Sequence, residues 1–168
     1  MVVVIFGFTI GTYTRNLAWA SEKSLWEDAM MKAPKSARPP HNLAWGHYEP
    51  KKEYDKAFLL YQASLDMYWP YKTYKAHSLY GMAGIYAITK DLKTAAEFYR
   101  KAIAIDPDDE MSHRQLMFTL MALNKWDAAL TQANILLSFR PGNEDYLYQK
   151  GVLLYRLHQY QNAIDCFR

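Results

Sequence analysis

The side chains that could catalyse a reaction or bind a metal are scattered along the chain. Cys166 is the only cysteine, so it has no partner for a zinc site or an internal disulfide. No His-Glu-x-x-His motif and no Gly-rich phosphate loop occurs. The histidines never lie three or four residues apart, the spacing that puts two metal ligands on one helix face; they are His41, His47, His77, His113 and His158. The sequence therefore predicts a chain that is not an enzyme and takes no metal or cofactor.

One acidic run could suggest calcium binding. It reads Asp-Pro-Asp-Asp-Glu over residues 106–110, without the glycine and the terminal glutamate of a calcium loop. Carboxylates at this density also begin helices, because they accept hydrogen bonds from the first free N–H groups and favour the positive end of the helix dipole. We expect this run to cap the next helix.

The composition indicates a globular, all-α protein. Of the 168 residues, 51% are hydrophobic and 22% charged, and the seven glycines and seven prolines lie between apolar-periodic segments. Runs of β-branched residues are missing after residue 12. The net charge of +3 is spread along the chain with acidic residues interleaved, whereas nucleic-acid binders usually concentrate basic charge on one face. We expect no nucleic-acid partner.

A period of thirty-four residues organises the helices. Ala95, Ala129 and Ala163 are separated by this interval, and so are Pro107 and Pro141. A small residue suits the point where two helices cross closely, and a proline ends the second helix because it has no N–H. These residues resemble the tetratricopeptide repeat. The resemblance implies a right-handed α-solenoid of stacked antiparallel helix pairs.

The layout follows from this register. Ala57 precedes Ala95 by thirty-eight residues, so four surplus residues are expected near residues 68–71, in a helix end or in the loop. Residues 15–168 form the array, with a half repeat at 17–34 and repeats at about 37–70, 71–107, 108–141 and 142–168, the last one truncated. The expected helices are 17–33, 37–48, 52–67, 71–88, 92–105, 109–122, 126–139, 143–157 and 160–168.

A protein or peptide partner is the expected ligand, because stacked repeats form a concave groove lined mainly by the first helix of each pair. Aromatic side chains suit such a groove, although each of them could instead pack between helices. The carboxylate clamp of co-chaperone tetratricopeptide domains is not expected. That clamp uses lysine, asparagine and arginine side chains, whereas the equivalent positions here are His41, Trp45, Gly81, Met111 and Gln115. The register gives these groove candidates: Asn42, Trp45, His77, Tyr80, Arg114, Phe118, Tyr148 and Tyr155.

The N-terminal segment, residues 1–14, begins with an uncharged apolar run that is too short to span a bilayer, which takes about 20 residues. It is interpreted first as the end of a transmembrane helix. A buried first helix is a second reading. A signal peptide is a third, since Ala18-Trp19-Ala20 fits a cleavage pattern, but no basic residue precedes the apolar run and Arg15 follows it.

A second resemblance concerns the junction after this segment. It rests on Thr14-Arg15-Asn16-Leu17-Ala18-Trp19 followed by Glu22, Leu25-Trp26, Pro34, Arg38 and Asn42-Leu43. These residues resemble the border between the last membrane helix and the repeats in bacterial relatives of the transmembrane and tetratricopeptide-repeat O-mannosyltransferases.

The junction resemblance implies an accessory repeat region of a membrane glycosyltransferase-like protein, with the repeats outside the cytoplasm. The basic residues at 15, 23, 32, 35 and 38 favour the cytoplasmic side instead. The sequence therefore predicts a membrane-tethered interaction scaffold, with extracytoplasmic repeats slightly favoured.

Overall fold

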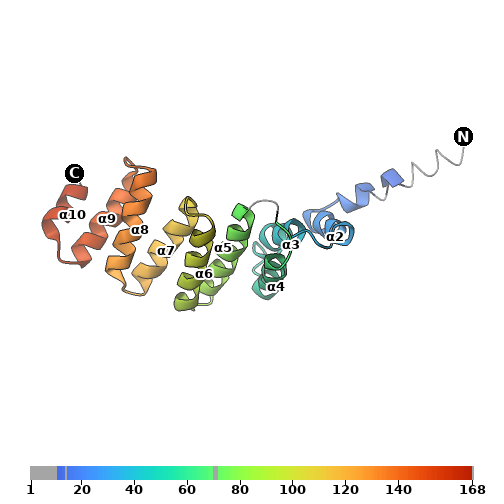
Figure 1. Cartoon of the computed structure of the whole chain (residues 1–168), viewed down its shortest axis with the longest axis horizontal. Coiled ribbons are helices and arrows are strands. Elements are labelled where there is room, and N and C mark those ends of the chain that lie inside the picture. The colour runs from blue at the N-terminus through green and yellow to red at the C-terminus, as the bar shows by residue number, and fades with distance from the viewer. Residues whose placement is uncertain (1–10, 14, 70–71, 168) are drawn as a thin grey trace, which may run out of the picture. The chain divides into compact units, whose positions relative to one another are not determined.

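The computed structural model describes residues 11–13, 15–69 and 72–167. These residues are almost entirely helical, as predicted, and their β-type pairing is limited to one isolated bridge, between Ser36 and Tyr68. The chain divides into two compact units, residues 1–78 and residues 79–168 (Figure 1). Helix α5 (Lys72–Ile88) contains the boundary between them.

In the first unit, residues 11–13 and 15–18 are helical, and α2 (Glu22–Lys32) follows them and packs against α3 (Arg38–Leu43). Helix α3 continues directly into a π-helical turn, η1 (Ala44–Tyr48), and the chain then reverses into α4 (Tyr54–Leu65). Backbone hydrogen bonds join the segment before α3 to the segment after α4. The Ala37 N–H donates to the Tyr68 carbonyl and the Tyr68 N–H donates to the Lys35 carbonyl, both over 3.2 Å.

The second unit contains the end of α5 and five further helices, each packed against the next in chain order (Figure 1). Three of the starts have a side-chain cap, because Asp91, Asp109 and Asn143 each accept a hydrogen bond from a backbone N–H of the following first turn. Asp109 thus confirms the capping role expected of the acidic run. The helices are α6 (Leu92–Ile105), α7 (Glu110–Ala122), α8 (Trp126–Phe139), α9 (Glu144–Arg156) and α10 (Tyr160–Cys166).

The turn inside each helical pair repeats one backbone conformation. Two residues before the second helix, the backbone has a positive φ between 56° and 66°, at Lys52, Lys90, Asn124 and His158. None of these residues is a glycine, although side chains other than asparagine rarely adopt this left-handed conformation. All four are exposed. The reversal of the chain is therefore alike in every pair.

The small residues of the repeat occupy equivalent buried places. Ala57, Ala95 and Ala129 have 0% exposed surface, and Ala163 has 2%. In the second unit, Ala95 and Ala129 belong to one continuous apolar core. The periodic alanines therefore mark closely packed helix contacts, as their spacing predicts.

The structure differs from the expected layout at the start of α2. Helix α2 begins at Glu22 and not at residue 17, because Ser21 caps it through a reciprocal hydrogen bond with Ser24. The four surplus residues lengthen a helix, as one of the two expected alternatives: α5 has 17 residues, close to the expected 71–88, while α7 and α9 have 13 each. Phe167 falls at the same place in its repeat as the buried Tyr99, yet Phe167 is exposed.

The membrane prediction concerns residues 1–14, of which 1–10 and 14 lie outside the described residues. Within the part of the chain that the structure describes, no helix combines the length and the apolar character needed to cross a bilayer.

Candidate functional site

A cavity of about 490 Å³ lies between α7 and α9 in the second unit. Side chains of both helices line it, together with residues from the loop between α8 and α9. The two walls are the first helices of successive pairs, which is where the groove of a repeat array is expected. The lining residues are Glu110, Met111, Arg114, Phe118, Arg140, Asn143, Asp145, Tyr146 and Gln149.

The α7 wall has a mixed apolar and cationic surface. Met111, Arg114 and Phe118 follow one another at intervals of three and four residues, which places them on one face of the helix. Met111 is 47% exposed and Phe118 is 41% exposed, while Arg114 is half-buried. Asp109 fixes the start of this helix by accepting hydrogen bonds from Met111 N–H and Ser112 N–H.

One end of the cavity is held by a three-residue polar cluster. The Tyr146 hydroxyl donates to Glu110 Oε1 over 2.5 Å, and Arg140 Nε lies 2.9 Å from Glu110 Oε2. Burial raises the pKa of the Tyr146 hydroxyl, and the hydrogen bond to Glu110 adds to this effect. Both carboxylate oxygens of Glu110 are therefore engaged, and the cluster ties α7 to α9 and to the loop before it.

Arg114 and Asp145 are the cavity's other charged residues. Arg114 Nε is buried and has no hydrogen-bond acceptor within the described part of the chain. Asp145 lies on the α9 side and is exposed. Among the described residues, neither side chain takes part in an ion pair.

The cavity brings together two of the groove candidates, Arg114 and Phe118. Tyr80 instead packs beside Tyr99, with ring centroids 5.6 Å apart. Tyr148 and Tyr155 are exposed, and their rings contact residues at the two ends of α10, Phe167 at 5.8 Å and Tyr160 at 5.5 Å.

The remaining candidates lie in the first unit. Trp45 is 64% exposed and belongs to the π-helical turn, whereas Asn42 is half-buried on α3. His77 is exposed on α5 and stacks 6.5 Å from His41. The assignment of these eight residues to a binding groove stays a prediction.

Sequence reasoning missed the polar end of the cavity, formed by Glu110, Arg140 and Tyr146. It considered only outward faces of first helices, whereas Arg140 follows the end of a second helix and Tyr146 is buried. One feature of the sequence could have indicated this end of the cavity. The loop that contains the periodic Pro141 leads into α9, and in a repeat array such a loop lies beside the start of the preceding first helix, α7.

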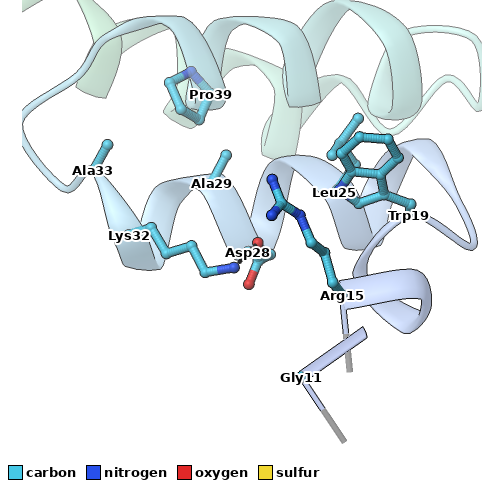
Figure 2. Close-up of a pocket in the computed structure, with 9 residues that line it drawn as sticks. All are labelled: Gly11, Arg15, Trp19, Leu25, Asp28, Ala29, Lys32, Ala33 and Pro39. Carbon is cyan, nitrogen blue, oxygen red and sulfur yellow. Dashed lines mark hydrogen bonds and ion pairs between the residues drawn. The ribbon is translucent and has the colours of Figure 1, made fainter. Parts of the chain in front are cut away.

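A second cavity, of about 810 Å³, lies in the first unit beside α2 (Figure 2). Figure 2 shows the Arg15 and Lys32 side chains reaching toward Asp28 from two sides. Lys32 Nζ lies 2.6 Å from Asp28 Oδ2, and Arg15 lies over the Trp19 ring at 5.8 Å. Asp28 is therefore paired with Lys32, and the Arg15 guanidinium lies against an aromatic ring.

His41 has a structural role. It is 7% exposed, and its Nδ1 lies 2.7 Å from Ser78 Oγ. Burial, assisted by the nearby His77, lowers the pKa of His41 from 6.5 to about 4. A neutral buried imidazole cannot hold a carboxylate as an ion pair. In the described ranges, no group of three or more His, Cys, Asp or Glu side chains is arranged to hold a metal ion.

Comparisons with known proteins agree with this architecture. Residues 76–109, which comprise α6 and most of α5, match the family model described as tetratricopeptide repeat. No curated protein matches the sequence.

Solved structures resemble the whole fold. A crystal structure of MamA has a TM-score of 0.72 at 13% identity and covers 84% of this chain and 80% of that chain. YrrB, described as a TPR protein with an unusual peptide-binding site, has a TM-score of 0.67 at 18% identity, covering 94% and 76%. MamA from Desulfovibrio magneticus RS-1 has a TM-score of 0.65 at 16% identity, covering 77% and 71%.

These likenesses establish the fold. The chain is an all-α solenoid of stacked antiparallel helix pairs of the tetratricopeptide type, as its thirty-four-residue period predicts. The junction resemblance to the O-mannosyltransferase relatives stays a prediction.

Proposed function

We propose that the chain is a protein-interaction scaffold that binds an extended segment of a partner protein in the cavity between α7 and α9. The observation that carries the proposal is the exposure of Met111 and Phe118 at the wall of a cavity that also contains hydrogen-bonding side chains. Large apolar side chains exposed beside a concave site are typical of surfaces that bind a partner.

The chemistry of the cavity suits a peptide. Gln149 can donate and accept hydrogen bonds, as an extended backbone requires, while Phe118 and Met111 offer contact area for a side chain. Two first helices one repeat apart form the walls, so a peptide can cross from α7 to α9. The peptide-binding site named for the structurally similar YrrB supports the same class of ligand.

The experiment selects ligands from a phage-displayed library of random linear peptides. We expect the chain to enrich a family of related peptides, and we expect Phe118→Ala to weaken their binding about tenfold or more, because it removes a central aromatic contact. Affinities are measured by fluorescence anisotropy with labelled copies of the selected peptides.

The matched control is Tyr160→Ala. Tyr160 is also an exposed aromatic residue of the second unit, but it lies on a second helix, does not line the cavity and is not a groove candidate. It should leave peptide affinity within about twofold. Failure to enrich any peptide family, or equal losses in both variants, would contradict the proposal.

We also propose that residues 1–14 attach the scaffold to a membrane, with the repeats outside the cytoplasm. The apolar run and the aromatic residues that follow it support the attachment, because such residues flank membrane segments. The junction resemblance supports the orientation, against the basic residues that favour the cytoplasmic side. In bacterial cells that produce the chain, a membrane-impermeant maleimide should label Cys166 in intact spheroplasts. Recovery in the soluble fraction would contradict attachment, and labelling only after lysis would contradict the orientation.

The alternative function is an accessory repeat region of a membrane glycosyltransferase-like protein, which the junction residues support. It predicts that the reading frame upstream of Met1 encodes several apolar segments of about 20 residues each. A stop codon immediately upstream would exclude it.

A further inference from the structure

Only part of the charge in the α7–α9 cavity is available to a ligand. Arg140 and Glu110 form an ion pair of 2.9 Å, and the second oxygen of Glu110 accepts from Tyr146. Arg114 and Asp145 lack such partners among the residues that the structure describes. A ligand therefore meets a cation on the α7 wall and an anion on the α9 wall.

Of these two charged groups, Arg114 has the greater need of a hydrogen-bonding partner. Arg114 Nε is buried without an acceptor, whereas Asp145 is exposed and can be solvated. A buried N–H without an acceptor is unfavourable, and a guanidinium is best satisfied by a carboxylate, whose two oxygens match its donors. An anionic planar acceptor beside Arg114 would satisfy this N–H.

We infer that the cavity selects partner segments that carry an aspartate or glutamate side chain at Arg114 next to an apolar side chain on Phe118 and Met111. This inference rests on the proposed function and names the sequence of the segment that is bound. Arg114 stands between Met111 and Phe118 on one helix face, so the acidic and apolar side chains of the ligand lie close together.

Asp145, the anion on the opposite wall, restricts further which peptides can bind and in which register. Asp145 repels a carboxylate, so the acidic side chain is confined to the α7 side and the segment has one favoured register. Asp145 also opposes a doubly charged phosphate or a nucleic-acid backbone more strongly than a singly charged carboxylate. A single carboxylate fits the charge of the cavity better than either.

The test compares peptides selected by the wild-type chain with those selected by Arg114→Glu, from one phage-displayed library of random linear peptides. Wild type should enrich Asp or Glu beside an apolar residue, and Arg114→Glu should enrich Lys or Arg at that place. Changing the acidic residue of a selected peptide to Asn or Gln should weaken its binding to wild type about tenfold or more. A phosphoserine peptide of otherwise equal sequence should bind less tightly.

Two further variants keep the result interpretable. Arg114→Gln retains a donor without the charge, and it should lose the acidic preference while still binding through Phe118. Arg100→Glu makes the same charge change on the exposed side of α6, outside the cavity, and should leave the selected sequences unchanged. Circular dichroism checks that each variant stays folded.

The outcomes separate this inference from the proposed function. Peptides that bind through Phe118 without acidic enrichment, or with the same preference in Arg114→Glu, would overturn the inference and leave the scaffold proposal standing. Tighter binding of the phosphoserine peptide would overturn the inference that Arg114 binds a carboxylate, and would indicate that it binds a phosphate. Selection of no peptide family would overturn both proposals.

Discussion

At the scale of the residue, His41 is a buried titratable group whose surroundings oppose its charged form. Its imidazole is enclosed by Tyr61 and Trp69, with ring centroids 5.5 and 5.6 Å away, and hydrogen bonds to Ser78. Ser78 Oγ lies a further 3.0 Å from Ser64 Oγ, and both serines are fully buried. A proton added to His41 would therefore place a charge where the facing groups are aromatic rings, two hydroxyls and the cationic form of His77.

This environment predicts a specific loss of stability in acid. The folded-state pKa of His41, about 4, lies below the unfolded value of 6.5, so between these values the unfolded chain binds more protons. The contribution of His41 is fully present above pH 6.5 and declines as the pH falls toward 4. The full loss amounts to about 3 kcal/mol.

The measurement is urea unfolding of wild type and His41→Gln between pH 7 and pH 4. Gln can still hydrogen-bond to Ser78 but does not titrate, so the stability advantage of wild type should shrink as the pH falls. Burial raises the pKa of Glu49, which has the opposite effect on stability, but both proteins contain Glu49 and its effect cancels in the difference. An advantage that stays constant over this range would contradict the assignment.

At the scale of the element, the close approach of paired helices depends on the periodic alanines. Ala129 has no exposed surface and belongs to the core of the second unit. Ala129→Leu should lower the free energy of unfolding by about 1–3 kcal/mol, because added methylenes force neighbouring side chains and backbone to shift. Urea unfolding monitored by circular dichroism measures this change.

The control is Ala122→Leu, at the exposed last residue of α7. Leucine and alanine have similar helix propensities, so this variant should change stability by less than about 0.5 kcal/mol. If the two variants are equally stable, Ala129 does not mark a tight contact.

Most of the elements were predictable from the sequence, because the period and the prolines determine where helices pair and end. Helices α6 and α8 have the predicted bounds. The length of α5 also agrees with the expected helix 71–88, although a count of residues alone could not say whether a loop or a helix end receives the surplus. The π-helical turn at Ala44–Tyr48 left no signal, because its apolar and polar residues also fit an α-helix.

The candidate site was predictable in part. Arg114 and Phe118 follow from the outward face of a first helix, and the structure places both at the cavity between α7 and α9. The contacts of Glu110 with Tyr146 and Arg140 span thirty-six and thirty residues, and such pairs depend on how neighbouring repeats stack. A periodic pattern gives the faces of helices, but not the side-chain pairs across them.

At the scale of the whole molecule, the chain consists of two compact units, and in the second unit each helix packs mainly against its neighbours in sequence. The stability of such arrays comes from the individual repeats and from the interfaces between neighbours. A change at one interface therefore destabilises most the helices that form it.

Hydrogen exchange should reveal this locality. In Ala129→Leu we expect faster amide exchange in α7 and α8, a smaller change in α6 and α9, and unchanged exchange in α3 and α4 of the first unit. Mass spectrometry of peptic fragments gives the comparison. Equal acceleration throughout the chain would mean that both units unfold as one cooperative body.

The left-handed turn residues give the molecule a set of equivalent attachment points, one in each helical pair that has such a turn. Lys52, Lys90, Asn124 and His158 are exposed, and the backbone, not the side chain, defines each turn. Single cysteines introduced there, after Cys166 is replaced by serine, would carry spin labels or fluorophores at matching places in successive repeats. Distances between such labels in solution would report directly how far one repeat advances on the next.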